Sequence, residues 1–552
     1  MMNRINLPSS RGVLILVIVG LGVVIYFLAM DALFLAGHLD SSFDDAYMFI
    51  RYARNLLGGH GIAWNSDGVQ TYGATSLLYL FWIAAALAVF PSAAPGAILA
   101  VSSFTFGLGY VTVLALGTIK FAASDFLKRN RLLFPVFTAA ALMVSKYFRL
   151  HSISGMDTTL SVFCNSLLAV ATIAWAKKPG RASLAWLTLA AYASFLTRPD
   201  ALLYALLFPL LYGWFFLGEE RNWNIIRFLI AFTAILALDT LIKFLIFGDP
   251  LPLPFYTKRA GFFDGYRGAA MWNPVEYLFI FLRLMLPFLG ILLFAANSKS
   301  GRLVAAFFTP VVLTFAYFFS VTQVMGFWAR YYFPALPFFV MGSFISLEAR
   351  LRESERPLFP FFSLRGALAT VALLFFFLPF PEKTFIRVYE TRFIPPPTIY
   401  KSAIARSLDG DVPKLGWRTS INGISEISLQ LPVGTRVAMS EYGLVGARAP
   451  QIYIIDLIGL HDPVFAHNGF FTQELFRRNP DIIWFPPPDY TKIVAALQDD
   501  ATLLEDYDYY PNAFDYGLAV RRDADAYELI TEVLAATWVK YYPDLELKRY
   551  PP

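Results

Sequence analysis

The chain has little cysteine and little histidine. Cys164 is the one cysteine among 552 residues, so the chain cannot form an intramolecular disulfide. Five scattered histidines argue against a zinc site built on histidine. No glycine-rich phosphate-binding loop lies between an expected strand and an expected helix, so the sequence does not support a nucleotide-sugar or ATP site. An activated substrate, if one is used, is then expected to be carried by the membrane.

Charge is also scarce, and this scarcity defines the class of protein. Only 15% of the residues are charged, against about 25% in soluble proteins, and 57% are hydrophobic. The mean hydropathy of +0.54 predicts a polytopic α-helical membrane protein. About twelve apolar segments precede residue 381: 13–35, 76–90, 98–119, 132–147, 158–176, 183–197, 201–217, 228–247, 277–296, 303–321, 333–347 and 364–380.

The loops between these segments alternate in charge. One set is basic and is expected in the cytoplasm with the N-terminus, at 120–131, 177–181, 221–227, 299–302 and 350–356. The first apolar segment is too long for a signal-peptide core, so we expect it to remain uncleaved. An odd number of crossings must separate residue 44, outside, from the basic loop at 120–131. We therefore expect segment 76–90 not to cross, which leaves about eleven spans and an extracytoplasmic C-terminus.

The composition changes near residue 381. Residues 1–380 form the expected membrane domain, with a first outer loop at 36–75. Residues 381–552 contain no membrane-length apolar run, and short β-type runs at 436–440, 452–456 and 481–485 alternate with helical patterns, as at 527–539. This pattern predicts an extracytoplasmic α/β-type domain, large enough to bury its own core.

Two adjacent carboxylates, Asp44 and Asp45, open the polar part of the first outer loop. Acidic pairs are costly at a membrane surface and usually have a function there. A helix starting here places Asp44, Arg51 and Asn55 on one face. A carboxylate can remove a proton from a hydroxyl, and the guanidinium groups of Arg51 and Arg54 suit phosphate oxygens. The structural alternative is that an aspartate caps the helix.

Three further outer segments carry polar residues. His60 and Asn65 lie beside a tryptophan, which suits a sugar or an ordinary membrane interface. Asp157 precedes an apolar run and is either a site residue or a helix cap. Arg198 and Asp200 join two apolar segments and either bind a ligand or pair with each other.

Cations also occur on the expected outer face, against the usual charge bias. The proline-rich loop at 249–267 contains Tyr256 and Lys258, and the loop at 327–332 contains Arg330 and Tyr331. Such cations fit a lipid-linked phosphate, although a Tyr–Lys pair is also a common interfacial anchor.

Taken together, these segments resemble a known family. Asp44-Asp45, the run 51–65 and the segments 154–157, 198–201, 253–258, 330–334 and 456–462 follow, in order, the pattern of GT-C glycosyltransferases. The chain is most similar to the terminal β-(1→2) arabinofuranosyltransferases of mycobacterial cell walls and their bacterial relatives. Asp157 and Gln70 stand where those relatives often have glutamate, which leaves the sugar and the acceptor open.

The resemblance implies a GT-C-like membrane fold with an extracytoplasmic active site in the bacterial plasma membrane. Asp44 or Asp45 would be the catalytic base, and Lys258 and Arg330 would face the phosphate of a polyprenyl-phosphate sugar donor. The acceptor would be a cell-envelope glycan or glycolipid, and His461 and Asp462 are candidates for holding it.

We therefore expect an inverting glycosyltransferase, possibly transferring arabinofuranose, that requires no nucleic acid partner. The sequence requires no cofactor and leaves room for a divalent cation between carboxylate and phosphate. A transporter or flippase for a lipid-linked or anionic solute is the alternative, although no internal repeat supports it. A scaffold that only binds partners would leave the Asp44–Asp45 pair without a function.

Overall fold

The computed structural model describes residues 10–39, 43–259, 272–296, 300–320, 327–353 and 416–550, apart from 489 and 512, together with residues 368, 371–372 and 376. Contacts divide the chain into two units. The first, called here the helical unit, comprises Met1–Ser42, Gly96–Asp239 and Ala270–Ile394, and the second, the sheet unit, comprises Phe43–Pro95, Thr240–Ala269 and Pro395–Pro552. Most of the first outer loop thus groups with the C-terminal segment. The expected boundary near residue 380 lies outside the described residues.

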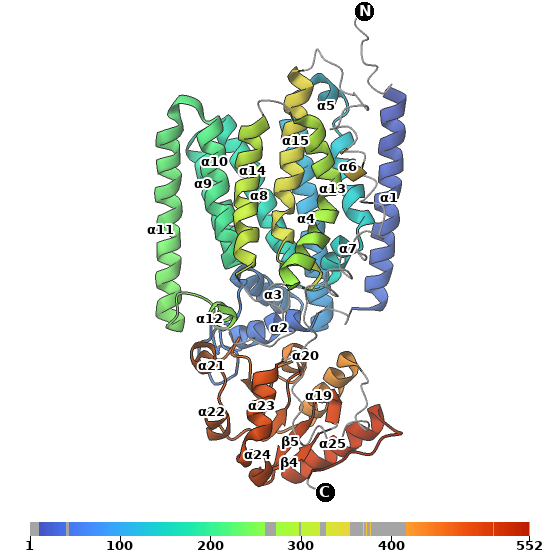
Figure 1. Ribbon diagram of the computed structural model, residues 1–552, viewed down its shortest axis with the longest axis vertical. Helices are drawn as coiled ribbons and strands as arrows, with labels where there is room; N and C mark the ends of the chain where they lie inside the picture. The colour runs from blue at the N-terminus through green and yellow to red at the C-terminus, as the bar shows by residue number, and fades with distance from the viewer. Residues whose placement is uncertain are drawn as a thin grey trace, which may run out of the picture. The chain divides into compact units, whose positions relative to one another are not determined.

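The helical unit is built from long apolar helices that run alongside one another (Figure 1). Its principal helices are α1 (Ser10–Gly37), α4 (Pro95–Phe121), α6 (Leu133–Val144), α7 (Lys146–Ile153), α8 (Thr158–Lys177), α9 (Arg181–Thr197), α10 (Leu202–Phe216), α11 (Arg221–Phe247), α13 (Trp272–Ala295), α14 (Ser300–Phe318) and α15 (Leu336–Glu353). Helix α11 belongs to the helical unit up to Asp239, and its remainder, from Thr240, belongs to the second segment of the sheet unit.

The lengths of these helices support a polytopic membrane protein. Among the described residues, seven helices are long and apolar enough to cross a membrane, or eight if the bent pair α6–α7 is one span. Apolar side chains of α1 are widely exposed, including Ile25 at 65% and Leu33 at 71%. An apolar surface of this kind is unfavourable in water and suits lipid.

The described residues do not confirm the expected eleven spans. Helix α3 (Leu77–Val89) has 13 residues, short of the roughly 20 that a span needs, as expected for the segment that does not cross. Helix α9 has 17 residues and falls just below the length of the others. The expected last span at 364–380 lies almost wholly outside the described residues.

A polar contact inside the helical unit fixes the loop that contains Arg330. Asn165, on α8, donates through Nδ2 to the carbonyl oxygen of Pro334 at 2.7 Å and accepts from the Ser194 hydroxyl on α9. A buried amide that satisfies two partners is stabilising, because an unpaired one would pay its desolvation cost. The contact therefore joins α8, α9 and the segment before α15.

The sheet unit contains a mixed five-stranded sheet in the order β2-β1-β3-β5-β4. Its strands are β1 (Arg436–Met439), β2 (Tyr453–Asp456), β3 (Ile482–Trp484), β4 (Tyr507–Tyr510) and β5 (Leu518–Arg521). β1 pairs in parallel with β2 and β3, and β5 pairs antiparallel with β3 and β4. The first three strands lie within the three β-type runs expected from the sequence, which are confirmed.

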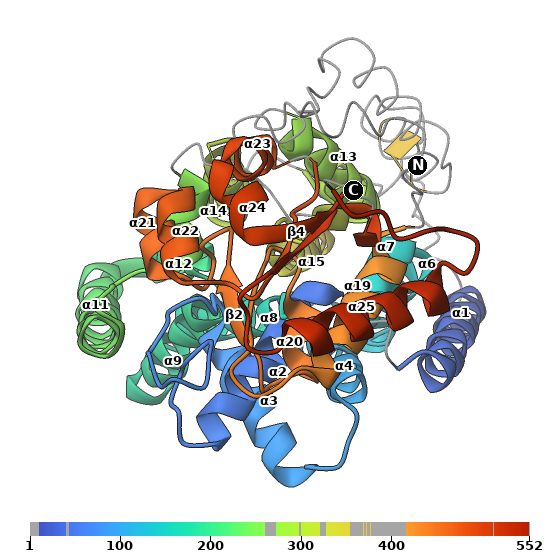
Figure 2. The same cartoon turned by 90° about the horizontal axis from the view of Figure 1, so that it is seen from below.

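Helices complete the sheet unit. They are α2 (Asp44–Leu57), α3, α12 (Leu253–Arg259), α19 (Trp417–Gln430), α20 (Gly443–Arg448), α21 (Pro463–Asn468), α22 (Thr472–Arg477), α23 (Thr491–Asp499), α24 (Ala501–Asp506) and α25 (Tyr527–Tyr541). α19 and α25 pack side by side, as Figure 2 shows in orange and red. α25 matches the expected helical pattern at 527–539. Because α2 packs on α20, the segment that contains α2 and the C-terminal segment share one core.

Candidate functional site

The structure gathers the candidate residues into two groups, one in each unit. The helical unit brings together five of them, from three loops that are distant in sequence: Asp157, Arg198, Asp200, Arg330 and Tyr331. The sheet unit contains the other candidates: Asp44, Asp45, Arg51, Arg54, Asn55, His60, Asn65, Tyr256, Lys258, His461 and Asp462. The two groups are described separately.

Asp44 is held by the first turn of α20. Its carboxylate accepts hydrogen bonds from the backbone N–H groups of Gly443, at 3.0 Å, and Leu444, at 2.6 Å. The residue that precedes α2, Phe43, makes no side-chain capping bond. The capping alternative therefore takes an unexpected form, because Asp44 satisfies amides of α20, which lies far away in sequence.

A third carboxylate, Glu441, joins Asp44 and Asp45. Glu441 is 7% exposed and accepts a hydrogen bond from the Trp417 indole N–H at 3.2 Å. Burial, with the negative charge of Asp45, raises the pKa of Asp44 to about 7, against the opposing effect of the two backbone N–H bonds. Burial, with the charges of Asp44 and Asp45, raises the pKa of Glu441 to about 8. We call Asp44, Asp45 and Glu441 the acidic group.

Asp44 and Glu441 can take and give a proton near neutral pH. Carboxyl groups with pKa values close to the working pH are suited to general acid–base chemistry, and interacting ones titrate as a set. The Arg418 guanidinium, on α19, is a nearby positive charge that opposes the rise in the pKa of Asp44. Sequence reasoning missed Glu441. The available signal was its place just after β1, because functional residues often follow the carboxyl ends of parallel strands.

Arg51 has a structural task, which corrects its expected role in binding phosphate. The side chain is buried, at 2% exposure, and its N–H groups donate to one side-chain oxygen and four backbone carbonyl oxygens: Asn65 Oδ1 and the carbonyls of Trp64, Gly446, Ala449 and Ile452. Arg54 likewise donates to the Ala447 carbonyl. These contacts fasten α2 to the connection between β1 and β2. They engage all five N–H groups of Arg51, whereas Arg54 is half-buried and its expected role at a phosphate stays a prediction.

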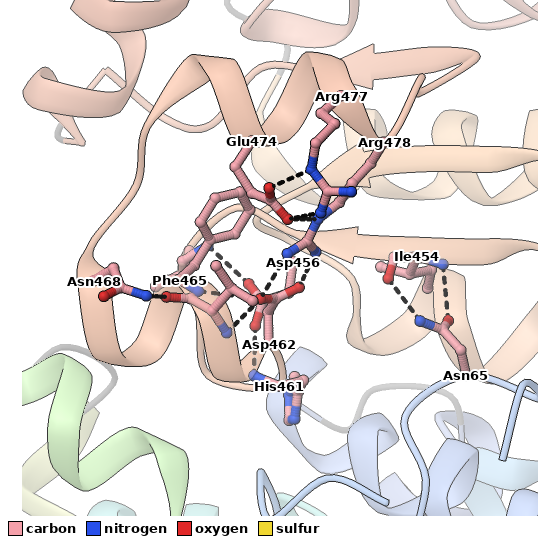
Figure 3. Close-up of polar contacts among 12 residues, drawn as sticks. Asn65, Ile454, Asp456, His461, Asp462, Phe465, Asn468, Glu474, Arg477 and Arg478 are labelled. Atoms are coloured by element: carbon pink, nitrogen blue, oxygen red, sulfur yellow. Dashed lines mark hydrogen bonds and ion pairs between the residues drawn. The ribbon is translucent and has the colours of Figure 1, made fainter. Parts of the chain in front are cut away.

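Asn55 and Asn65 also support the loop through bonds to the backbone. The sugar contacts that we expected from the sequence stay a prediction. Asn55 donates to the carbonyl oxygens of Ala63 and Trp64, at 2.8 and 3.0 Å. Asn65 accepts from the N–H of Ile454 at 2.9 Å and donates to its carbonyl at 3.0 Å, as Figure 3 shows. This amide therefore pairs with the edge of β2 as a neighbouring strand would. His60 is half-buried in the turn between them.

His461 is buried within the sheet unit, and its expected role in holding the acceptor stays a prediction. Its ring stacks on Trp64 with centroids 4.0 Å apart, and its Nδ1 lies 2.9 Å from the Tyr52 hydroxyl. Burial lowers the pKa of His461 to about 3, so the ring is neutral at physiological pH. The geometry gives this residue a packing role.

Asp462 orders the two helices that follow it. Its Oδ1 accepts from the N–H of Val464 at 3.0 Å and of Phe465 at 3.1 Å, which caps α21. Its carboxylate also pairs with Arg478, whose Nε donates to Glu474 at 2.8 Å (Figure 3). Asp462 thus has a cap and an ion pair within the sheet unit, and its expected contact with an acceptor glycan stays a prediction.

The loop before α12 attaches to α21. His467 Nε2 lies 3.1 Å from Asp249 Oδ1, and its ring lies 4.4 Å from that of Tyr256. Lys258 is half-buried on α12. The structure thus places Tyr256 and Lys258 in the sheet unit. The later part of the expected loop, at 260–267, lies outside the described residues.

The second group, in the helical unit, combines two arginines and two aspartates around one ring. Arg198 Nε donates to Asp200 Oδ1 at 3.0 Å, so the expected pairing of these residues is present. The Arg198 guanidinium lies 4.5 Å from the centre of the Tyr331 ring, and that of Arg330 lies 5.3 Å from it. Two guanidinium groups thus lie on one aromatic ring, and the two aspartates beside them balance their charge.

Asp157 completes this second group. It is 1% exposed, and among the described residues its Oδ1 has no hydrogen-bond partner. It precedes α8 but makes no capping bond, so the capping alternative is not supported. Burial raises the pKa of Asp157, and the charges of Arg330 and Arg198 oppose that rise. A buried acceptor beside two cations can bind a ligand that carries both a hydroxyl and an anionic group.

No metal is assigned to either group. Within the ranges that the structure describes, no set of three histidine, cysteine, aspartate or glutamate side chains is arranged to hold a metal ion.

Comparisons with known proteins reach only the sheet unit. Residues 420–542 are similar to a family whose description is "Domain of unknown function (DUF8728)". The matched region contains all five strands and Glu441, and it covers less than half of the chain. A search of curated proteins finds no match.

Proposed function

We propose that this chain is an inverting glycosyltransferase that moves a sugar from a polyprenyl-phosphate donor to a cell-envelope glycan. The observation that carries the proposal is the acidic group, in which the pKa values of Asp44 and Glu441 are raised to about 7 and about 8. The apolar helices supply a membrane setting for a lipid-linked donor. The resemblance of the loop segments to GT-C glycosyltransferases supplies the reaction class.

Asp44 is proposed as the general base. Two backbone amides fix the orientation of its carboxylate, and a pKa of about 7 leaves a large ionised fraction at neutral pH. The acceptor oxygen attacks the anomeric carbon as its proton passes to Asp44. The bond from that carbon to the phosphate oxygen breaks, and the electron pair leaves with the phosphate. Glu441, protonated at neutral pH, can donate a hydrogen bond beside the reacting hydroxyl.

The departing phosphate needs positive charge. We assign this task to Arg330 and Arg198, on the basis of their chemistry and, for Arg330, of the family resemblance. Guanidinium groups bind phosphate oxygens in a bidentate manner, and desolvation strengthens that interaction. Lys258, which the resemblance also implies, is proposed for the same ligand. Preorganised charge of this kind is worth about 3 kcal/mol or more in a transition state.

The proposed reaction takes place on the outer face of a bacterial plasma membrane. This orientation rests on the basic loops, which favour the cytoplasm, and on Asp44 and Asp45, which lie in the segment between the basic N-terminus and the loop at 120–131. The arabinofuranosyl donor is the first candidate because of the resemblance of the loops.

The test is glycosyl transfer by the purified full chain in nanodiscs. Polyprenyl-phosphate arabinofuranose and other polyprenyl-phosphate sugars are offered with short glycan acceptors. We expect transfer to fall by about 10² or more in Asp44→Asn. The Asp45→Asn and Glu441→Gln variants should lose less activity. Their side chains influence the protonation of Asp44 but do not themselves accept the proton. The matched control is Asp67→Asn, an exposed acid in the same loop, which should retain activity.

Folding is checked by thermal unfolding of each variant. Wild-type transfer rates in all three acidic-group variants would exclude the proposed base. Binding of a lipid-linked donor with no transfer to any acceptor would favour a transporter or flippase.

A further inference from the structure

A cluster of charged residues lies at one end of the helical unit, away from any residue used above. Lys120 is in the last turn of α4, Lys177 is in the last turn of α8, and Glu348 and Arg352 lie in the last turns of α15. We call these four residues the terminal basic group. In Figure 1 the end of α15 lies beside the short helix α5 (Asp125–Arg129), which follows α4.

Glu348 organises this group. Its carboxylate, 5% exposed, accepts from the N–H of Ala123 at 3.0 Å, from the N–H of Ser124 and from the Ser124 hydroxyl at 2.9 Å. Arg352 donates to it through Nε at 2.9 Å. The one carboxylate of the group is therefore already engaged by the connection between α4 and α5 and by Arg352.

The two lysines meet at a shared ring. The ammonium nitrogens of Lys120 and Lys177 lie 5.9 and 4.7 Å from the centre of the buried Phe121 ring. The charges of Arg352 and Lys120 both act on Lys177. Three cations and one carboxylate give the group a formal charge of +2. Like charges this close repel one another, and an anion bound among them would relieve the repulsion.

The position of the group indicates the kind of anion. α4 and α8 are both long and apolar enough to span a bilayer, and the two lysines lie in their final turns. Cations at the end of a span reach the level of the lipid headgroups. The phosphate of a lipid headgroup is present at that level at high local concentration, whereas a free phosphate would have to be drawn from solution.

We propose that the terminal basic group binds the phosphodiester headgroup of an anionic phospholipid of the surrounding membrane. General attraction of basic loops to anionic lipid is a weaker explanation, because here the cations come from three helices and are positioned by buried groups, Arg352 by Glu348 and the two lysines by the Phe121 ring. Lys128 and Arg129 lie nearby on α5 and are exposed. Among the described contacts, neither side chain bonds to Glu348 as Arg352 does. They provide an internal comparison.

The experiment is native mass spectrometry of the full chain with phosphatidylglycerol and phosphatidylcholine at equal concentrations. We expect wild type to retain phosphatidylglycerol selectively. Lys120→Gln combined with Lys177→Gln should weaken this binding about 25-fold, since each cation contributes about fivefold at a membrane surface. The control, Lys128→Gln combined with Arg129→Gln, removes the same charge and should change the binding by less than about threefold.

Three outcomes would overturn the proposal. Equal losses in the two double variants would mean that only the overall charge matters. Equal retention of the two lipids by wild type would mean that no anionic headgroup is recognised. Displacement of bound lipid by millimolar inorganic phosphate would identify a site for free phosphate. If the glutamine variant unfolds, Lys120→Arg with Lys177→Arg keeps the charges and should retain the lipid, and loss of selectivity in that folded variant would also contradict the proposal.

Discussion

The backbone N–H of Leu444 donates to Oδ1 of Asp44 at 2.6 Å, which joins two residues 400 positions apart in sequence. The N–H of Gly443 donates to Oδ2 of the same carboxylate. The orientation of the proposed base is therefore determined by the C-terminal segment. A substitution in that segment should therefore alter the position of Asp44, even where no proposed catalytic residue is changed.

Gly443→Ala should separate α20 from α2. A Cβ atom at this position would overlap the backbone carbonyl oxygen of Asp44, and a backbone group cannot swing aside as a flexible side chain can. We expect the free energy of unfolding to fall by about 2 kcal/mol or more, with a parallel loss of transfer. Urea unfolding followed by tryptophan fluorescence measures the first effect. Gly22→Ala, which meets nothing within 4 Å, is the control, and equal stability of both variants would contradict the prediction.

Arg51→Lys should destabilise the sheet unit although it conserves charge. Lysine cannot reproduce a planar group that bonds Asn65 and several carbonyl oxygens at once, so buried acceptors lose their partners. We expect a loss of about 2–4 kcal/mol. Arg477→Lys is the matched control, because its side chain is 72% exposed and water screens its ion pair with Glu474.

The same measurement separates two roles for Arg51. A structural role predicts that transfer falls with the folded fraction and that the donor KM of the folded fraction is unchanged. A raised donor KM in a variant as stable as wild type would restore the phosphate role expected from the sequence.

Arg51 also shows the limit of the sequence pattern. Its spacing from Asp44 correctly predicted one helix and one face. A guanidinium binds a phosphate oxygen and a backbone carbonyl oxygen by the same hydrogen bonds, so residue type could not distinguish a ligand from the chain near residue 450. Glu441 was missed for the related reason that it is an isolated acid in sequence, and only the fold brings it to Asp44.

The regular elements were easier to predict than the site. β-type runs identified β1, β2 and β3 because they are short apolar stretches buried in a sheet. The odd number of crossings required by the loop charges, together with its short length, predicted that segment 76–90 does not cross. The corresponding helix α3 has 13 residues. The grouping of segment 43–95 with the C-terminal region depends on long-range contacts such as that between Asn65 and Ile454, which have no local signature.

Transfer should rise with pH and level off above about 7. The pKa of Asp44 is raised to about 7, and the base acts only when ionised. Asp45→Asn removes a negative charge that raises this pKa, so the rising limb should move to lower pH. The measurement is kcat/KM from pH 5 to 9 at constant ionic strength. A limb that stays in place, or moves to higher pH, would exclude Asp44 as the titrating group.

Stability should change with pH in the opposite direction. The folded pKa of Asp44, about 7, exceeds its unfolded value of 3.8, so between these values the folded state binds more protons. Its contribution to stability is fully present below about pH 4 and is lost as the pH rises through about 7. The urea midpoint should therefore fall over this range, by a smaller amount in Asp45→Asn. Asp67→Asn serves as control, and a midpoint that rises with pH in all three proteins would contradict the assignment.

Tyr331→Phe should preserve donor binding, whereas Tyr331→Leu should weaken it. The ring lies beneath both Arg198 and Arg330, and phenylalanine retains an aromatic face for the two guanidinium groups. Leucine leaves two buried cations without that face, and each such contact is worth about 1–2 kcal/mol when desolvated. We therefore expect the leucine variant to raise the donor KM about tenfold or more, with the phenylalanine variant within about twofold of wild type. Initial rates against donor concentration, at saturating acceptor, give these values. Equal loss in both variants would assign the effect to the tyrosine hydroxyl, and a change confined to the acceptor KM would remove this group from donor binding.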